Sequence, residues 1–415
     1  MRALYVFLFC LLLPFAEIKA DAGPAAGQLI QYSLVKSFPR EELQAFFKLH
    51  KIPKAVLPVK QGLNVYEVIY TTLYADSSLV KASGLLYVPM DRHIPLSRLI
   101  YNHGTEICRD RSCSFTGEQS ICLSFATDDY VVMTPDYVGM GQGDRNQLYL
   151  NAFTEARAST DMLQACEPLL ALLNVKLNHH LFVTGYSQGG HAAMATTRML
   201  QQNYAGEYTV TASAPMSGPY DIENTVYEGR NNPYDYPGFL MLLLRSYFES
   251  EGKLDELHTV LKAPYDTLIP PLVDGNYPID EVDKLLPDTI FLAVNDSFYN
   301  EFVNNPNCGF RTYLRKNNVY DWKPDMHMQL CYCNGDEEVN YKNSITAYET
   351  MKRNGSKKVE LWRAGKKFGH VNCALFAVVY TKMYFDGFRH GHPGHHGPVF
   401  KRLLLEIGKM VVPAR

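Results

Sequence analysis

The stretch VTGYSQGGH, residues 183–191, constrains the fold of this chain more than any other. An apolar run precedes it at residues 181–183, and a helix-favouring run follows at residues 191–200. Ser187 stands among three glycines, which lack the Cβ atoms that would collide where a helix crowds against a strand. The pattern therefore predicts a strand, a sharp turn and a helix, with the Ser187 hydroxyl exposed at the turn.

Strand-like and helix-like segments alternate around this turn. Residues 64–75 and 81–89 alternate in polarity and predict antiparallel edge strands, after an irregular lead-in at residues 24–60 with one helix near residues 41–49. Short apolar runs further along, separated by helix-like segments, predict buried strands. This alternation predicts an α/β fold with a mostly parallel central sheet flanked by helices.

The alternation stops after residue 221 and resumes near residue 326. Residues 222–325 are rich in Tyr, Pro and Asn, with helical stretches between them. We expect a helical cap insertion at 222–325, which divides the α/β core into a first part at 21–221 and a second part with a C-terminal tail at 326–415. The alternative is a peripheral elaboration, because a cap needs a site beneath it.

The first twenty residues have the pattern of a secretory signal peptide. Arg2 is followed by an apolar run at residues 3–13, and Ala20 could mark cleavage. The run is too short to span a bilayer, which disfavours the alternative of a membrane anchor. We expect a soluble, secreted protein.

The cysteines agree with export. Removal of residues 1–20 leaves eight of the nine cysteines, and an even number in an exported chain predicts disulfides. Cys331 and Cys333 alternate in a predicted strand, so we expect them to pair elsewhere rather than with each other. Two sequons, at Asn295 and Asn354, are candidate glycosylation sites.

The net charge and the spacing of cysteines and histidines disfavour nucleic acid and metal ions as partners. The formal net charge of -3 gives no general reason to expect nucleic acid. The cysteines lack zinc-site spacing, and the histidine-rich run at residues 390–396 is interpreted as a solvated loop. We expect no metal and no cofactor.

A serine is a weak nucleophile without a base and an orienting acid. His370 and Asp336 each follow a predicted strand, at the sheet edge where sites in open α/β sheets form. Asp336 is preferred because the preceding Asn-Gly turn would bring it over the strand end. The rival acids are Glu337, Glu338 and Asp221. The rival histidines are His191, a surface or packing residue in this interpretation, His327 and the run at 390–396.

Acyl transfer also needs donors for an oxyanion. The backbone N–H of Gln188, directly after the serine, is one candidate. The loop that ends the run LIYNHGTE supplies the second, at Thr105 with Gly104.

Five segments together resemble a known family. LIYNHGT, PDYVGMGQGD, GYSQGG, NGDEEVNYKNS and the Gly-His at 369–370 occur in the order seen in α/β-hydrolases. The chain is most similar to the secreted lipase and esterase branch with a helical cap, over roughly residues 64–390. The resemblance implies a serine hydrolase of carboxylic esters with Ser187, Asp336 and His370 as its triad. Many relatives carry His-Gly-Gly-Gly at the oxyanion loop, whereas here a single Gly104 precedes Thr105.

Two other functions fit the same pattern. A peptidase could use the same triad, since fold and triad serve many chemistries. A catalytically inactive binding protein would usually lack a triad member, and every candidate is present here. The leading hypothesis is an esterase or lipase acting on a small-molecule or lipid ester, compatible with transient contact at a membrane or lipid surface.

Overall fold

The computed structural model of the protein describes residues 25–50, 57–91, 93–109, 118–394 and 396–414. The predicted signal peptide at residues 1–20 lies outside this part of the chain. None of the helices within it combines the length and the apolar character that crossing a bilayer requires.

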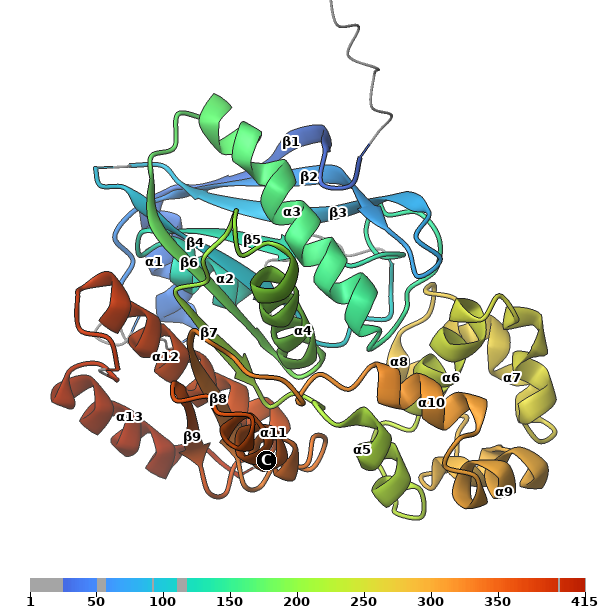
Figure 1. Ribbon diagram of the computed structural model, residues 1–415. Helices are drawn as coiled ribbons and strands as arrows, with labels where there is room; N and C mark the ends of the chain where they lie inside the picture. Colours follow the sequence, from blue (N-terminus) through green and yellow to red (C-terminus); the bar gives the residue numbers. More distant parts are fainter. Residues whose placement is uncertain (1–24, 51–56, 92, 110–117, 395, 415) are drawn as a thin grey trace, which may run out of the picture.

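The described residues form one nine-stranded sheet in the order β1-β2-β3-β5-β4-β6-β7-β8-β9 (Figure 1). Neighbouring strands from β5 to β9 along this order pair in parallel, whereas β1, β2 and β3 are antiparallel additions at one side. The strands are β1 (Leu29–Phe38), β2 (Leu63–Leu73), β3 (Leu79–Pro89), β4 (Leu96–Asn102), β5 (Tyr130–Pro135), β6 (Leu177–Tyr186), β7 (Ala212–Met216), β8 (His327–Cys333) and β9 (Val359–Gly365).

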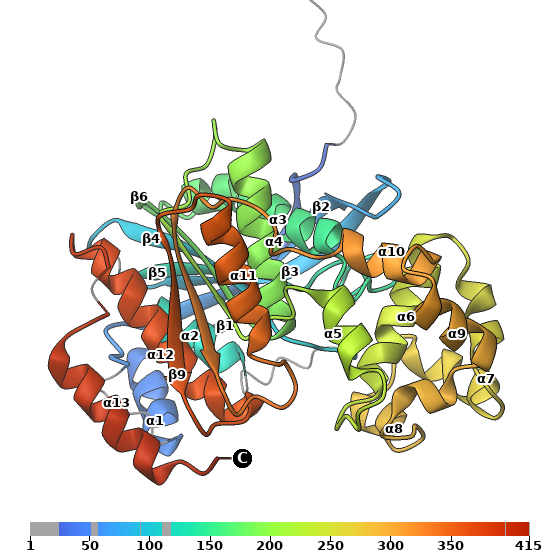
Figure 2. The same cartoon turned by 60° about the horizontal axis from the view of Figure 1, so that its bottom comes forward.

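Helices cover both faces of the sheet (Figures 1 and 2). Helices α3, α4 and α11 pack on one face, and α1, α2 and α12 pack on the other with α13 outside α12. These helices are α1 (Arg40–Leu49), α2 (Gln119–Ala126), α3 (Ala152–Leu172), α4 (Gln188–Asn203), α11 (Lys342–Arg353), α12 (His370–Arg389) and α13 (Val399–Val411). The predicted α/β class, with a mostly parallel sheet between helices, is confirmed.

The beginning of the described chain differs from the prediction. The predicted helix near residues 41–49 is present as α1, but β1 occupies part of the predicted irregular lead-in. Most side chains of β1 are exposed, so its sequence lacks the alternation that would have marked it as a strand. Since β1 takes the outer position, β2 and β3 are antiparallel as predicted but lie inside the sheet rather than at its edge.

A helical insert, residues 222–325, separates β7 from β8, and its apolar residues form one cluster with Ile107, Tyr149 and Leu150 of the core. Glu223 in its first helix pairs with Arg311 and Arg315 in its last, at 3.0 and 2.8 Å, which joins the two ends of the insert. The insert contains α5 (Ile222–Gly229), α6 (Gly238–Ser250), α7 (Tyr265–Leu268), α8 (Ile279–Asp283), α9 (Asp296–Asn304) and α10 (Gly309–Lys316), with 3₁₀ turns at Leu254–Val260, Pro270–Val273 and Ile290–Ala293.

Hydrogen bonds attach the insert to the core. The Asn317 side chain accepts from the Ala152 N–H at 2.9 Å, at the start of α3, and the Ser246 hydroxyl accepts from the Tyr149 N–H at 2.6 Å. These two hydrogen bonds hold the insert over the sheet edge.

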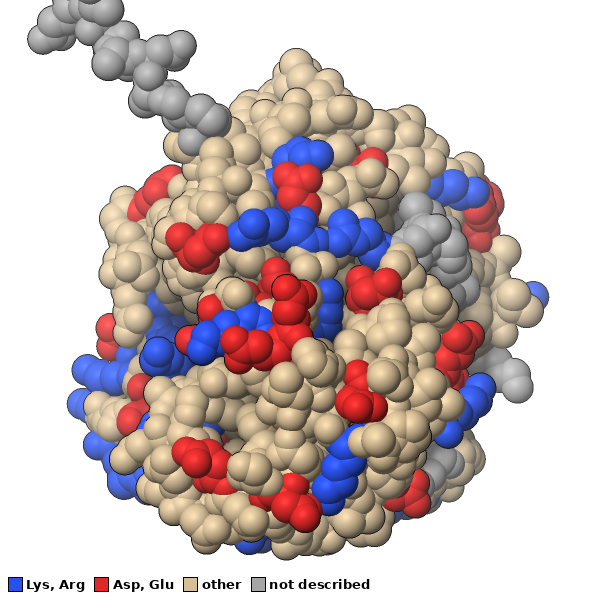
Figure 3. Space-filling model, turned by 90° about the vertical axis from the view of Figure 1, so that its right-hand side faces the viewer, with Lys and Arg blue, Asp and Glu red and all other residues tan. Residues whose placement is uncertain are grey.

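Figure 3 looks onto the side of the molecule that carries the insert, where acidic and basic side chains are interspersed among uncharged residues.

Candidate active site

Ser187 occupies the turn between β6 and α4, as the sequence predicts. Its backbone has φ 59° and ψ -123°, a conformation that is strained for a residue with a side chain. The Ser187 N–H donates to the Met216 carbonyl at 3.1 Å, which ties the turn to the end of β7. The helix follows at once, so the serine lies where the N-terminal amides of α4 contribute positive charge.

Close backbone contact explains the glycines around Ser187. A Cβ at Gly189 would lie 2.0 Å from the Asn102 carbonyl oxygen, at the end of β4. A Cβ at Gly185 would lie 2.2 Å from the Gly189 carbonyl oxygen. Both distances are far below van der Waals contact, so only glycine fits at these two positions.

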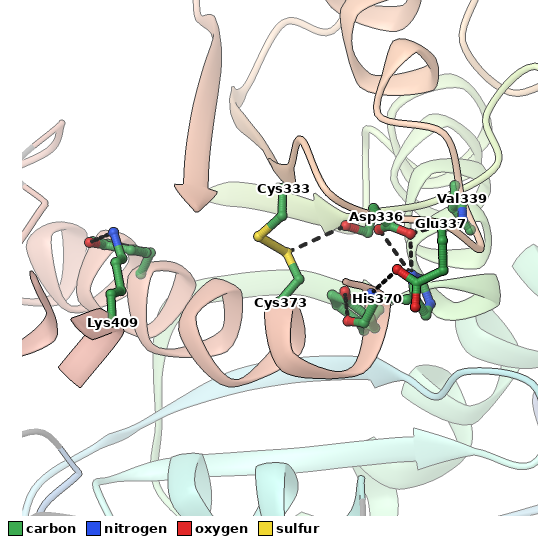
Figure 4. Close-up of a disulfide and its surroundings, with 10 residues drawn as sticks. Cys333, Asp336, Glu337, Val339, His370, Cys373 and Lys409 are labelled. Atoms are coloured by element: carbon green, nitrogen blue, oxygen red, sulfur yellow. Dashed lines mark hydrogen bonds and ion pairs between the residues drawn. A yellow bond between two sulfur atoms is a disulfide. The ribbon is translucent and has the colours of Figure 1, made fainter. Parts of the chain in front are cut away.

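His370 and Asp336 lie together at the ends of neighbouring strands (Figure 4). Asp336 follows β8, His370 begins α12 after β9, and the His370 Nδ1 is 2.9 Å from both carboxylate oxygens of Asp336. The Val339 N–H donates to Asp336 Oδ1 at 2.9 Å and fixes the carboxylate. The buried Nε2 of His370 has no hydrogen-bond partner among the described residues.

Two of the three rival acids of the sequence analysis also contact His370, whereas Asp221 caps α5 by accepting from the Asn224 N–H at 3.2 Å. Glu337 Oε2 accepts the His370 backbone N–H at 3.1 Å, and Glu338 Oε2 lies 3.8 Å from the ring Nε2. Burial opposes the charged form of His370, but the hydrogen bond and charge of Asp336, together with both glutamates, raise its pKa above the ordinary value. Asp336 is thus the acid that hydrogen bonds to the ring, with Glu337 and Glu338 around it.

A disulfide holds this strand end to the helix (Figure 4). Cys333, the last residue of β8, is bonded to Cys373 in the first turn of α12, with their Cα atoms 5.9 Å apart. Each cysteine is three positions from the Asp336 or His370 that it supports. Cys333 therefore pairs elsewhere, as predicted, whereas the prediction that Cys331 also pairs elsewhere is wrong, because Cys331 is a free thiol.

Not every cysteine is paired as the even number suggested. Cys166, Cys308 and Cys331 are buried free thiols. Burial disfavours the thiolate and raises the pKa of Cys331 to about 12. Cys331 therefore behaves as a small apolar core residue, whereas the Cys308 sulfur caps α10 by accepting from the Arg311 N–H at 3.5 Å. Cys113 lies outside the described residues.

A cavity of about 620 Å³ lies between the insert and the core, with Ser187 in its wall. Core residues and insert residues both line it, so the insert covers the serine as a cap would. The core contributes Tyr149, Leu150, Ser187, Gln188, Glu337 and Glu338, and the insert contributes Phe239, Leu240, Leu243, Ile290 and Phe291.

The predicted oxyanion residues lie beside the turn. Gln188 is the first residue of α4, so its N–H has no acceptor within the helix. A Cβ at Gly104 would be 3.4 Å from the Tyr186 carbonyl oxygen, but the Gly104 N–H already donates to Glu118 Oε2 at 2.7 Å. The Thr105 hydroxyl is 3.1 Å from that of Tyr149, which lines the cavity.

Comparison with solved structures agrees with this arrangement. The rice cell wall degrading esterase LipA from Xanthomonas oryzae superposes with a TM-score of 0.80 at 26% identity, over 88% of this chain and 99% of that one. The closed state of Candida antarctica lipase A superposes with a TM-score of 0.69 at 15% identity, over 90% of this chain and 84% of that one. The chain has the α/β-hydrolase fold. No family model and no curated protein sequence matches it.

The rival histidines of the sequence analysis have other surroundings. His191 is buried, not at the surface: its Nδ1 is 2.7 Å from Glu155 Oε2, and its Nε2 donates to the Asn317 carbonyl at 2.8 Å. His327 begins β8, at the strand end opposite Asp336. In the 390–396 run, His390 and His392 are exposed, whereas His396 stacks on Trp362 with centroids 3.8 Å apart. That run is therefore only partly solvated.

The sequence analysis missed two residues that support the site. Glu155, buried on α3, accepts from the Gln188 side chain at 2.8 Å as well as bonding His191. The Tyr186 hydroxyl donates to the His370 carbonyl at 2.6 Å, so strand β6 contacts the histidine directly. The only feature of the sequence that could have marked Glu155 is that an acidic residue lies on the inward face of a helix rich in small residues. No feature of the sequence marked Tyr186.

The two candidate glycosylation sites differ in exposure. Asn354 is exposed at the end of α11, where its side-chain amide donates to Asp321 at 2.9 Å. Asn295 is half-buried before α9, and its amide donates to the Thr259 carbonyl at 2.6 Å. Both remain predicted glycosylation sites, with Asn354 the more accessible.

The substitution Gly189→Ala tests the close contact between Gly189 and the Asn102 carbonyl. Gly189→Ala would force two backbone segments apart, so we expect a loss of about 1–3 kcal/mol in the free energy of unfolding and a distorted Ser187 turn. Gly206→Ala is the matched control, because a Cβ there meets nothing within 4 Å. Chemical denaturation measures both variants. A Gly189→Ala protein as stable as the parent would contradict this account of the turn.

Proposed function

We propose that this protein is a secreted serine hydrolase that cleaves carboxylic esters. The observation that carries the proposal is a strained Ser187 in the wall of a covered cavity, at the same sheet edge as the bonded pair Asp336–His370. The similarity to an esterase over nearly its full length supports an ester as substrate.

The proposed chemistry follows from the positions of these groups. His370 Nε2 takes the proton of Ser187 as Oγ attacks the ester carbonyl, and then gives that proton to the departing alcohol. Asp336 accepts the Nδ1–H, which leaves the Nε2 lone pair free as the base and stabilises the imidazolium that forms. Water then repeats the sequence on the acyl-enzyme and releases the acid.

The developing oxyanion needs two donors near Ser187. The Gln188 N–H is the first, and the Thr105 N–H is our candidate for the second. The Gly104 N–H is less suitable, because Glu118 already accepts it.

The cavity supports an amphiphilic substrate. Apolar side chains of the insert, including Phe239, Leu243 and Phe291, face the space above Ser187 and suit an acyl chain. Acidic and amide groups line another part of the same cavity. We therefore propose small-molecule or lipid esters as substrates, hydrolysed without a metal or cofactor.

Export is part of the proposal. The cationic start and short apolar run of residues 1–20 support a signal peptide. The disulfide between Cys333 and Cys373 supports folding in an oxidising compartment, where such bonds persist.

Ser187→Ala tests the nucleophile. We expect kcat on p-nitrophenyl esters from acetate to palmitate to fall by roughly 10⁵–10⁶-fold, because the attacking oxygen is lost. Circular dichroism and thermal unfolding check that the variant folds. Equal activity in the parent and the variant would contradict the mechanism, and cleavage of peptides but not esters would favour a peptidase.

The pH dependence of the parent tests His370 as the base. Only neutral His370 accepts the proton, and its pKa is raised, so kcat/KM should fall as the pH drops through a value above about 6.5. Asp336→Asn removes the charge and the correct acceptor, so we expect kcat to fall by roughly 10⁴-fold. An acid limb well below this range in the parent, or full activity in Asp336→Asn, would contradict these roles.

A further inference from the structure

Glu338 lies beside the ring nitrogen of His370 that makes no hydrogen bond to a described residue. Its Oε2 is 3.8 Å from Nε2, whereas Nδ1 is occupied by Asp336. The His370 side chain is 6% exposed and that of Glu338 is 10% exposed. The Glu338 carboxylate makes no hydrogen bond to any described residue, although both it and Ser187 line the same cavity.

Hydrogen bonds on both sides fix the backbone at Glu338. The Tyr234 hydroxyl, from the insert, donates to the Glu338 carbonyl at 3.3 Å. On the other side, the Val339 N–H donates to Asp336. Glu338 is thus fixed between the insert and the turn that carries Asp336, with its carboxylate directed to the cavity and to Nε2.

The cavity around Glu338 is acidic. Four acidic residues and two basic ones line it: Asp221, Glu228, Glu337 and Glu338 against Arg230 and Lys342. Burial raises the pKa of Glu338, an effect that His370 opposes and that Asp336, Glu337 and Asp235 reinforce. A cation bound in this part of the cavity would relieve the repulsion among these carboxylates.

We propose that Glu338 forms a leaving-group subsite that selects esters of positively charged alcohols. The inference rests on the proposed function, because the proton on Nε2 passes to the departing oxygen. The alcohol portion of the ester must then lie next to Nε2, and therefore next to Glu338. A positive charge a few bonds from the ester oxygen would contact the carboxylate, whereas a neutral group of the same shape would leave it unpaired.

Two esters of equal shape test this selection. Butyrylcholine and 3,3-dimethylbutyl butyrate share an acyl group and differ in a quaternary nitrogen replaced by carbon. We expect the parent to favour the choline ester in kcat/KM, and Glu338→Gln to lower that preference by roughly tenfold while it still cleaves the neutral ester. Glu256→Gln, which removes the same charge from the exposed surface of the insert, should keep the preference.

The pH dependence of kcat/KM separates substrate selection by Glu338 from an effect of Glu338 on the base His370 alone. The carboxylate of Glu338 helps raise the pKa of His370, together with Asp336 and Glu337, so Glu338→Gln should also move the acid limb of kcat/KM to lower pH for both esters. A shifted limb with an unchanged preference would overturn the subsite and leave Glu338 a residue that only tunes the base.

The remaining outcomes are also decisive. If Glu338→Gln fails to fold, inhibition of the parent by choline and by 3,3-dimethylbutanol supplies the same comparison, and stronger inhibition by choline is expected. Equal inhibition, or equal cleavage of both esters by the parent, would overturn the inference while ester hydrolysis stands. If the parent cleaves no ester, including p-nitrophenyl esters, then the proposed function fails and the subsite fails with it.

Discussion

The first turn of α4 packs directly against the end of β4, with no side chain between them. Gly189 meets the Asn102 carbonyl there, and Gly185 meets Gly189, so the chain between β6 and α4 has room for only a very sharp turn. Ser187 consequently takes a positive φ and presents its side chain to the cavity. The strain at this residue is offset by the extensive packing of the strand and helix on either side.

Parallel pairing gathers the remaining groups at the same edge. Strands β6, β7, β8 and β9 are parallel neighbours, so the segments that follow them emerge at one edge of the sheet, where His370 lies. The Cys333–Cys373 disulfide and the Tyr186 hydroxyl then fix the histidine from two sides. Three carboxylates around the imidazole favour its charged form, which the proposed mechanism requires after the first proton transfer.

The sequence was informative where the candidate site depends on local pattern. The Ser187 turn, the Asn-Gly turn before Asp336 and the loop before His370 could be predicted, because each follows an apolar strand and has residues with a specific backbone requirement. Strand β1 was missed because it buries almost nothing. The contacts of Glu155 with Gln188, of Glu118 with Gly104 and of Glu338 with His370 depend on segments brought together only by the tertiary fold.

Covalent labelling tests the central claim, that Ser187 is the activated nucleophile, most directly. The folded protein would be treated with a fluorophosphonate, digested and mapped by mass spectrometry. The account predicts a single adduct on the peptide that carries Ser187, lost in Ser187→Ala and much slower in His370→Ala. An adduct on a different serine, or no adduct in a protein shown to be folded, would contradict it.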